Sequence, residues 1–282
     1  MKISVIINTF NEERNIENCL KSVKWADEII IVDMYSDDRT VEIAGKYTDK
    51  IFFHERLGYA DPARQFALEK ASNEWILVVD ADELVPLNLK KRLVKIAQED
   101  VADVVYVPRS NYFAGEHING MGWGTMDDMV PRFFKKGYLN FGELLHNFFK
   151  LNADARIYHI DNPDESFLHF SYIDFEQYVN RMNRYTTIEA VNIFEGKKER
   201  NYLLKLFLLS IWKTFKEIIL IKWYKDGFRG ISLGFLGTYY TLIAYMKLKL
   251  MEEYNFKDTK EKVAEDYQKI IDEVIFEYEN ET

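Results

Sequence analysis

The stretch that most constrains the fold is residues 75–83, in which five apolar residues (WILVV) end abruptly in three acids. An uninterrupted apolar run of this length, closed by charge, is typical of a strand that is buried on both faces of a parallel sheet. In open α/β sheets, ligands bind where the carboxyl ends of such strands meet. We therefore expect Asp80 and Asp82 to lie at the rim of a binding crevice.

The spacing of these two acids also predicts a chemistry. Two carboxylates separated by one small residue repel each other unless a cation lies between them. Oxygen ligands of this kind suit Mg²⁺ or Mn²⁺. Asp-x-Asp also occurs in solvated acidic loops, and the motif by itself leaves that alternative open. Its position at the end of a buried strand favours a metal site.

Apolar runs and helical segments alternate on either side of this stretch. Runs that have the pattern of strands cover residues 3–8, 28–33, 50–54 and 75–80. Between them lie apolar residues at helical spacing, a run of small polar residues suited to helix capping, and an Asp-Pro pair suited to a first helical turn. This alternation indicates βαβ units, so we expect an α/β fold with a mostly parallel central sheet.

The second half of the chain has a different pattern. A helix is expected to begin at Pro86, followed by a strand over 103–108. Residues 112–171 have the pattern of short strands and loops, and the pattern is helical from residue 174 nearly to the end. We therefore expect the α/β domain to be followed by a helical C-terminal region.

Charge and cysteine content exclude some classes of protein. The chain has 282 residues and a formal net charge of −9, which argues against non-specific binding to nucleic acids. Its single cysteine, Cys19, excludes an internal disulfide framework and favours a reducing compartment. Met1 and Lys2 lead straight into an apolar run without the pattern of a secretory signal, so we expect a cytoplasmic location.

Residues 197–249 differ in charge from the rest, with eleven Lys or Arg residues and three acids. Within this segment Lys205, Lys213 and Lys216 share one face of an amphipathic basic helix. The uncharged run 230–246 has 17 residues, fewer than the ~20 needed to span a bilayer. We expect this region to contact the inner face of the cell membrane, or to pack within the protein or against a second copy of the chain.

Four short motifs lie at the predicted sheet edge and together resemble those of the family 2 glycosyltransferases, whose nucleotide-sugar domain has the fold called GT-A. The matching stretches are residues 4–13 (SVIINTFNEE), 32–40 (VDMYSDDRT), 63–65 (ARQ) and 80–82 (DAD). Three later stretches resemble the subgroup that builds lipopolysaccharide core and related surface glycans. These are residues 129–134 (MVPRFF), 145–147 (LHN) and 168–172 (LHFSY).

The resemblance implies a division of the chain into three parts. Residues 1–110 would be the nucleotide-sugar-binding half of the GT-A domain and residues 111–173 its acceptor-side half. Residues 174–282 would be the helical C-terminal region, which associates with membrane or dimerises.

The resemblance also implies a metal site. Asp82 is expected to bind Mn²⁺ or Mg²⁺ directly, and Asp80 to bind it or to contact the ribose or a metal-bound water. His169 or His146 would complete the metal shell. The bound metal would stabilise the charge of the departing nucleotide diphosphate.

For the nucleotide, the resemblance points to the ends of the first two strands. Asp33 would accept a hydrogen bond from the ring N–H of a uracil-like base, and Thr9, Asn11 and Glu12 would lie against that base. Arg64 would reach the base or the diphosphate. A surface ion pair is the alternative for Arg64.

An inverting transfer needs a general base for the acceptor hydroxyl, and three acids are candidates. They are Asp127, Asp128 and Glu143, of which we favour Asp128. Here the sequence departs from the subgroup, because its usual His-Glu pair is His146-Asn147. Asparagine cannot take a proton at neutral pH, so the identity of the base stays open.

These expectations combine into a predicted function. The chain would be a metal-dependent, inverting glycosyltransferase that moves a hexose from UDP to a surface glycan or glycolipid. Transfer to a polyprenyl phosphate is one alternative, and a non-catalytic nucleotide-sugar-binding scaffold is another. A sugar nucleotidyltransferase would need a glycine-rich basic loop after the first strand, which residues 9–12 (TFNE) do not provide.

Overall fold

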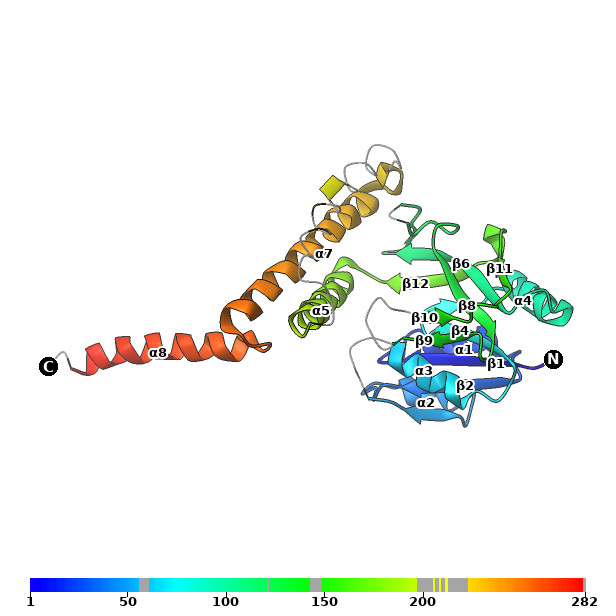
Figure 1. Ribbon diagram of the computed structural model, residues 1–282, viewed down its shortest axis with the longest axis horizontal. Coiled ribbons are helices and arrows are strands. Elements are labelled where there is room, and N and C mark those ends of the chain that lie inside the picture. Colours follow the sequence, from blue (N-terminus) through cyan, green and yellow to red (C-terminus); the bar gives the residue numbers. More distant parts are fainter. Residues whose placement is uncertain are drawn as a thin grey trace. The chain divides into compact units, whose positions relative to one another are not determined.

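The computed structural model describes residues 1–55, 61–120, 122–142, 149–196, 205, 208, 211–212 and 223–280, with residues 61, 62 and 223 described without their side chains. The chain divides into two compact units, Met1–Tyr178 with Ile218–Ser232, and Val179–Glu217 with Leu233–Thr282. The first unit carries the sheet, and the described part of the second is helical (Figure 1).

Parallel strands form the first half of the sheet. The elements are β1 (Ile3–Thr9), α1 (Ile16–Val23), β2 (Glu28–Asp33), α2 (Thr40–Ala44), β3 (Ile51–Phe53), α3 (Asp61–Lys70) and β4 (Trp75–Asp80). The strands pair in the order β3-β2-β1-β4, and all three pairings are parallel. The predicted α/β alternation is therefore confirmed for the described residues up to Asp80.

The second half of the sheet is mixed. It is built from β5 (Glu83–Leu84), α4 (Leu87–Glu99), β6 (Val104–Phe113), β7 (Glu116–His117), β8 (Met129–Lys135), β11 (Ile157–His159), η1 (Pro163–Glu165) and β12 (Phe167–Tyr172). A separate two-stranded sheet joins β9 (Leu139–Phe141) to β10 (Phe149–Leu151). β8 pairs antiparallel with both β4 and β6, and β12 pairs parallel with β6. β6 and β12 therefore point the same way as β4, and their carboxyl ends meet at one edge.

Apolar side chains fill both faces of this sheet. On one face α1 and α4 cover the strands with residues such as Leu20 and Leu93, and on the other α3 contributes Leu68. Along β4 the side chains alternate, so that Leu77 joins the first cluster and Val78 the second. β4 is therefore buried on both faces, as its unbroken apolar run predicts.

One element differs from its predicted extent, and it is β6. The helix α2 begins at Thr40, where the Asp38 carboxylate accepts a hydrogen bond from the backbone N–H at 2.9 Å. β6 continues to Phe113 rather than ending at residue 108, because its second half pairs with β12. That partner lies more than 50 residues further along the chain, so no local pattern reveals it.

The second unit contains the C-terminal helices. They are α5 (Phe175–Phe194), α7 (Gly227–Tyr254) and α8 (Thr259–Glu279), and the short η2 (Trp223–Asp226) precedes α7. α5 and α7 pack through a small apolar cluster that includes Ile193 and Leu248. The Lys247 ammonium on α7 donates to the Asn183 carbonyl on α5 at 2.7 Å. The prediction of a helical C-terminal region is confirmed, although α8 contributes no buried residue.

The predicted basic helix around Lys205, Lys213 and Lys216 lies largely outside the described residues. Lys205 alone of the three is described, and it is exposed. The uncharged run 230–246 lies within α7. Among the helices that the structure describes, none combines the length and the apolar character needed to cross a membrane.

Glu28, at the amino end of β2, is buried and joins several elements of the first unit. Its carboxylate accepts hydrogen bonds from the Ser72 backbone N–H and hydroxyl, both at 2.8 Å, and also contacts the Ser4 hydroxyl and the Lys50 ammonium. Burial favours the neutral acid, but the Lys50 contact and these hydrogen bonds lower the pKa of Glu28 to about 2. The charged carboxylate therefore stabilises this end of the sheet.

This arrangement makes the Glu28 contribution depend on pH. Because its pKa in the folded protein lies below the ordinary 4.5, the contribution is full above pH 4.5 and is lost as the pH falls towards about 2. We expect Glu28→Gln to lower the free energy of unfolding at neutral pH by about 1–3 kcal/mol. Urea unfolding at neutral pH and at about pH 2.5 measures this, with exposed Glu99→Gln as control. An equal loss at both pH values would contradict the assignment.

Candidate functional site

The parallel strands β1, β2 and β4 end in polar residues at one edge of the sheet. Thr9 lies in register with Asp33, and Asn8 with Asp80. Thr9, Asn8 and Asp33 are buried, and Asp80 is partly exposed. The prediction that these strands end at the same edge of the sheet is therefore confirmed.

The mixed half of the sheet brings further polar side chains to the same edge. β12 places His169 in register with Asn111 of β6 on one side and with Glu83 of β5 on the other. Arg109 precedes Asn111 by two residues, so both lie on the same face of β6. These residues come from parts of the sequence that are far apart, and only strand pairing makes them neighbours.

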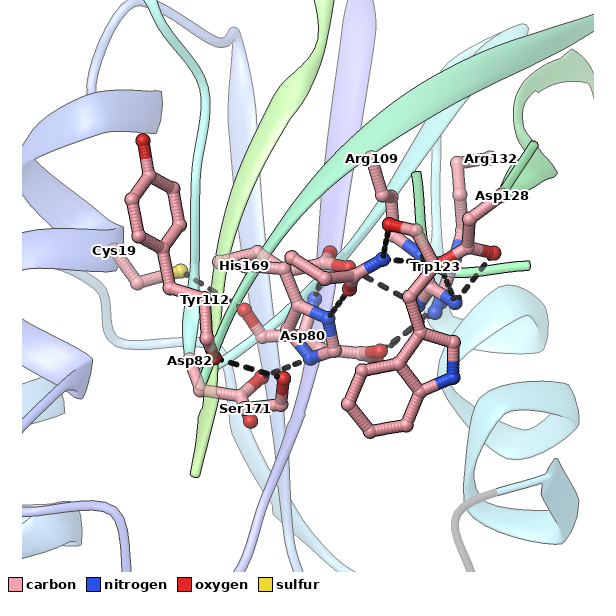
Figure 2. A network of polar contacts seen from close by, with 12 residues as sticks. Cys19, Asp80, Asp82, Arg109, Tyr112, Trp123, Asp128, Arg132, His169 and Ser171 are labelled. Atoms are coloured by element: carbon pink, nitrogen blue, oxygen red, sulfur yellow. Dashed lines mark hydrogen bonds and ion pairs between the residues drawn. The ribbon is translucent and has the colours of Figure 1, made fainter. Parts of the chain in front are cut away.

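Asp80 is held between two arginines, of which Figure 2 shows Arg132. Arg64 of α3 donates to Asp80 Oδ1 at 2.6 Å, and Arg132 of β8 donates to Oδ2 at 2.5 Å. Burial favours the protonated acid, but the Arg132 and Arg64 guanidinium groups hold the pKa of Asp80 well below its usual range. Asp80 is therefore an ionised carboxylate with both oxygens engaged.

Glu83 follows the Asp-x-Asp motif and is fully buried. Its Oε2 accepts a hydrogen bond from the Asp80 backbone N–H at 2.9 Å, and its Oε1 lies 3.5 Å from Arg109. Burial and the neighbouring Asp80 charge raise the pKa of Glu83, while the nearby arginines oppose that shift. Glu83 therefore fixes the backbone turn that carries the Asp-x-Asp motif.

Asp82 faces His169, with Oδ1 3.6 Å from Nε2. The other ring nitrogen of His169, Nδ1, lies 2.6 Å from the Asn111 amide oxygen. Burial alone would lower the pKa of His169. The Asp82 carboxylate favours the protonated ring more strongly, so the net shift of the pKa is upward. A carboxylate oxygen and a ring nitrogen thus point at the same small volume.

The three candidate bases differ in their surroundings. Arg109 Nε and Nη2 donate to the Asp128 carboxylate at 3.0 Å each, and the Asn111 amide donates to Asp128 Oδ2 at 2.8 Å. Asp127 is exposed beside Gly124. Glu143 lies outside the described residues, as does His146.

These contacts join into one network at the end of the sheet (Figure 2). It runs from Asp82 through His169, Asn111, Asp128 and Arg109 to Glu83, and it closes on the backbone of Asp80. With Arg64 and Arg132 included, the cluster holds three guanidinium groups and four carboxylates, those of Asp80, Asp82, Glu83 and Asp128. Its net charge is therefore −1 when His169 is neutral. A near-neutral cluster can accept both a divalent cation and an anionic ligand without a large electrostatic cost.

The loop after β1 is fixed to the loop after β2. The Asn11 amide donates to the Asp37 carboxylate at 2.7 Å and accepts from the Asp37 backbone N–H at 3.0 Å, and the backbone N–H of Glu12 donates to the Thr40 hydroxyl. The Asp33 carboxylate accepts hydrogen bonds from the Ser36 backbone N–H and hydroxyl at 2.7 and 2.6 Å. Each carboxylate oxygen can accept a second hydrogen bond, so the predicted contact of Asp33 with a nucleobase stays a prediction.

Two buried polar side chains at this edge have no hydrogen-bond partner among the residues that the structure describes. They are the Asn8 amide, through both its nitrogen and its oxygen, and the Thr9 hydroxyl. Unpaired buried polar groups cost about 1–3 kcal/mol each. A bound ligand at the end of β1 would remove that cost.

Asp82 and His169 fit a metal ion better than Asp80 does. Asp80 is engaged by two arginines, whereas the Asp82 oxygen and the His169 nitrogen converge. A mixed carboxylate and imidazole pair suits Mn²⁺ at least as well as Mg²⁺. Within the described part of the chain, no three His, Cys, Asp or Glu side chains gather as a complete metal shell. Remaining positions would therefore be filled by water and by ligand oxygens, as is usual for such ions.

Sequence reasoning missed four residues of the network: Glu83, Arg109, Asn111 and Arg132. Glu83 and Arg132 lie inside stretches that the sequence did single out, residues 75–83 and 129–134. Arg109 and Asn111 lie in a strand with no motif. Their partners are Asp128 before β8, Glu83 of β5 and His169 of β12, which only the folded chain brings to them.

The contact between Asp80 and Arg132 leads to a prediction about stability. The Arg132 side chain is 8% exposed, and removal of one partner of a buried ion pair leaves the other charge uncompensated. We expect Arg132→Met to lower the free energy of unfolding by about 3 kcal/mol, measured by urea denaturation. Lys95→Met, at a side chain that is 61% exposed, is the matched control and should change it little. A loss below about 1 kcal/mol for Arg132→Met would mean that Asp80 is solvated.

Comparison with known proteins identifies relatives of this chain. The model of the family described as "Glycosyl transferase family 2" matches residues 4–161. An uncharacterized glycosyltransferase of Rickettsia bellii is 27% identical over 267 residues, which cover 88% of this chain and 86% of the relative. The lipopolysaccharide core biosynthesis glycosyltransferase LpsC of Rhizobium meliloti is 27% identical over 211 residues, which cover 72% of this chain and 76% of LpsC.

Solved structures also resemble the chain. The crystal structure of S. aureus TarS 1-349 in complex with UDP-GlcNAc is 16% identical, with a TM-score of 0.48. The superposition covers 91% of this chain and 93% of that one.

Proposed function

The chain belongs to glycosyl transferase family 2, and we propose that it moves a hexose from a uridine-diphospho-sugar to a hydroxyl of a surface glycan or glycolipid, with Mn²⁺ or Mg²⁺ bound and with inversion. It is a glycosyltransferase of the GT-A fold. The observation that carries the proposal is the network in which Asp82, His169 and Asp128 meet at the carboxyl ends of the strands.

The donor would lie along the ends of β1, β2 and β4. The buried, unpaired Asn8 amide and Thr9 hydroxyl offer hydrogen bonds there, and Asp33 would accept from the base. Arg64 and Arg132 place positive charge beside Asp80, where the diphosphate would lie. The preference for a uridine nucleotide is part of the proposal.

Asp82 and His169 would hold the metal ion. When bound, the metal would stabilise the negative charge that develops on the leaving diphosphate. Asn111 accepts the His169 Nδ1 hydrogen, which leaves Nε2 facing Asp82 and the metal position. Such a hydrogen bond to the second nitrogen is the usual companion of a histidine ligand.

Asp128 would accept the proton of the acceptor hydroxyl. A carboxylate has about four acceptor positions, and Arg109 and Asn111 occupy three of them. One position therefore stays available, and the carboxylate is held in a fixed orientation. Asp127, which is exposed two residues before β8, is the alternative base.

The acceptor would approach along aromatic side chains. The Trp123 ring stacks on Tyr172 with ring centres 6.2 Å apart, and Tyr112 stacks on Phe170 at 5.2 Å. Figure 2 shows Trp123 and Tyr112 beside the network. Aromatic walls with a few polar groups are typical of binding sites for organic ligands. The relationship to LpsC, named for lipopolysaccharide core biosynthesis, supports a surface-glycan acceptor.

This proposal is tested by separating metal binding from turnover. Release of UDP from UDP-glucose, UDP-galactose and UDP-GlcNAc is measured with and without Mn²⁺ and a truncated lipopolysaccharide core. Electron paramagnetic resonance measures Mn²⁺ binding in the presence of UDP. We expect Asp82→Asn to weaken that binding by about 10–100-fold, because a ligand is lost.

Asp128→Asn is the matched variant, because it removes the proposed base and keeps the side-chain shape. We expect it to bind Mn²⁺ and UDP like the wild type but to release little UDP. Undiminished metal binding by Asp82→Asn would show the metal assignment to be wrong. A wild-type protein that binds UDP-sugars without turning them over would instead be a binding scaffold.

A peripheral contact with anionic membrane is the second part of the proposal. Along α7, six exposed apolar residues recur on one side of the helix: Phe228, Ile231, Phe235, Tyr239, Met246 and Leu250. No charged residue lies between Arg229 and Lys247. Together with the +8 charge of residues 197–249, this stripe has the features of a helix that lies in a membrane interface.

We expect the protein to sediment with phosphatidylglycerol-containing liposomes at low salt and to be released as salt rises, because the attraction of its lysines is screened. Phe235→Glu with Tyr239→Glu should abolish sedimentation. Phe276→Glu with Tyr278→Glu, at aromatic residues of the acidic helix α8 that are at least as exposed, should not. If the wild-type protein does not bind these liposomes at low salt, the membrane proposal is wrong and α7 would instead be a protein-binding surface.

A further inference from the structure

One side chain, Asn111, touches both the proposed metal ligand and the proposed base. Its amide oxygen lies 2.6 Å from His169 Nδ1, and its amide nitrogen donates to Asp128 Oδ2 at 2.8 Å. The same nitrogen donates to the Trp123 carbonyl oxygen at 3.0 Å. The Asn111 side chain is buried, so these three hydrogen bonds replace the contacts with water that an exposed amide would make.

The partners fix the direction of the amide. A carbonyl oxygen and a carboxylate oxygen can only accept, so the NH₂ group must face Trp123 and Asp128. The amide oxygen must then face His169, whose Nδ1 donates the hydrogen. The opposite nitrogen of the ring, Nε2, is thereby aimed at Asp82, 3.6 Å away.

The backbone around Asn111 restrains it as well. Asn111 is in register with His169 where β6 pairs with β12, and its carbonyl oxygen accepts a hydrogen bond from the Ile118 N–H at 2.9 Å. The amide therefore cannot turn towards one partner without moving away from the other. By contrast, Arg109 holds Asp128 from the other side and reaches Glu83 rather than His169.

We propose that Asn111 is a positioning residue that couples the metal ligand His169 to the base Asp128. One end of its amide sets the ring so that Nε2 faces the metal position, and the other end sets the carboxylate towards the acceptor. Seating of the metal and the nucleotide diphosphate would then orient the base through a single rigid group. This inference rests on the proposed function, because it assigns His169 and Asp128 the roles given above.

Two substitutions at Asn111 separate the two ends of the amide. Asn111→Asp keeps an oxygen for His169 Nδ1 but turns a second oxygen towards the Asp128 carboxylate and the Trp123 carbonyl. Asn111→Leu removes all three hydrogen bonds of the amide and keeps a similar volume. Asn192→Asp, at a buried asparagine of α5, is the matched control for placing a charge in the protein interior.

The readouts are Mn²⁺ binding in the presence of UDP and the rate of UDP release from UDP-glucose with water as acceptor. We expect Asn111→Asp to keep Mn²⁺ affinity within about threefold while UDP release falls by about 30-fold or more, since like charges now repel at the base. Asn111→Leu should weaken Mn²⁺ binding by about 10–100-fold and also slow UDP release. Asn192→Asp should leave both readouts at the wild-type level.

A rescue distinguishes positioning from a general loss of stability. Asn111→Asp combined with Asp128→Asn exchanges donor and acceptor, so the contact is restored with reversed polarity. We expect this double variant to regain the melting temperature lost by Asn111→Asp and to bind Mn²⁺ normally, but to release no more UDP than Asp128→Asn.

Three results would overturn the inference. If Asn111→Asp releases UDP like the wild type, Asn111 does not position the base, and the proposed function stands. If Asn111→Leu binds Mn²⁺ like the wild type, Asn111 does not position the metal ligand. A wild-type protein that binds no Mn²⁺ with UDP would remove both this inference and the metal-dependent function.

Discussion

The Asp80 carboxylate ends a strand that is buried on both faces, and its charge is tolerated there because guanidinium groups reach it from two sides. Arg64 comes from α3, which packs on the parallel half of the sheet, and Arg132 comes from β8, the first antiparallel strand. The same contact therefore joins the two halves of the sheet at the edge where the candidate site lies. Glu83 also holds Asp80 in place, because its carboxylate accepts a hydrogen bond from the Asp80 backbone N–H.

The other polar groups of the site extend from this point in one continuous network. Because each member of the network has a defined partner, the acids keep separate surroundings. Asp80 is paired with arginines, Asp82 faces a histidine, Glu83 is buried, and Asp128 is held by Arg109 and Asn111. Four acids within one site can thus carry different roles: structural for Asp80 and Glu83, and proposed metal binding and proton transfer for Asp82 and Asp128.

Strand periodicity and strand ends were visible in the sequence. The apolar runs predicted the strands up to Asp80, and the burial of β4 in particular, because burial on both faces demands an unbroken run. The Asp-x-Asp motif was placed correctly at the sheet edge for the same reason. The extent of β6 was not visible, because Arg109 and Asn111 are polar residues in a strand whose partner β12 is distant in sequence. The roles of individual residues, including Asp33 and the choice of base, remain predictions.

By itself the sequence determined the fold class, the family resemblance and the edge of the sheet at which the acids lie, since these follow from local patterns of apolar and charged residues. The tertiary structure alone decided which polar groups touch. Arg132 of β8 donates to Asp80, and Asn111 stands between His169 and Asp128. The physical reason is that these contacts depend on the pairing of β4 with β8 and of β6 with β12. The paired residues are more than 50 positions apart in the sequence, a distance over which no periodicity carries information.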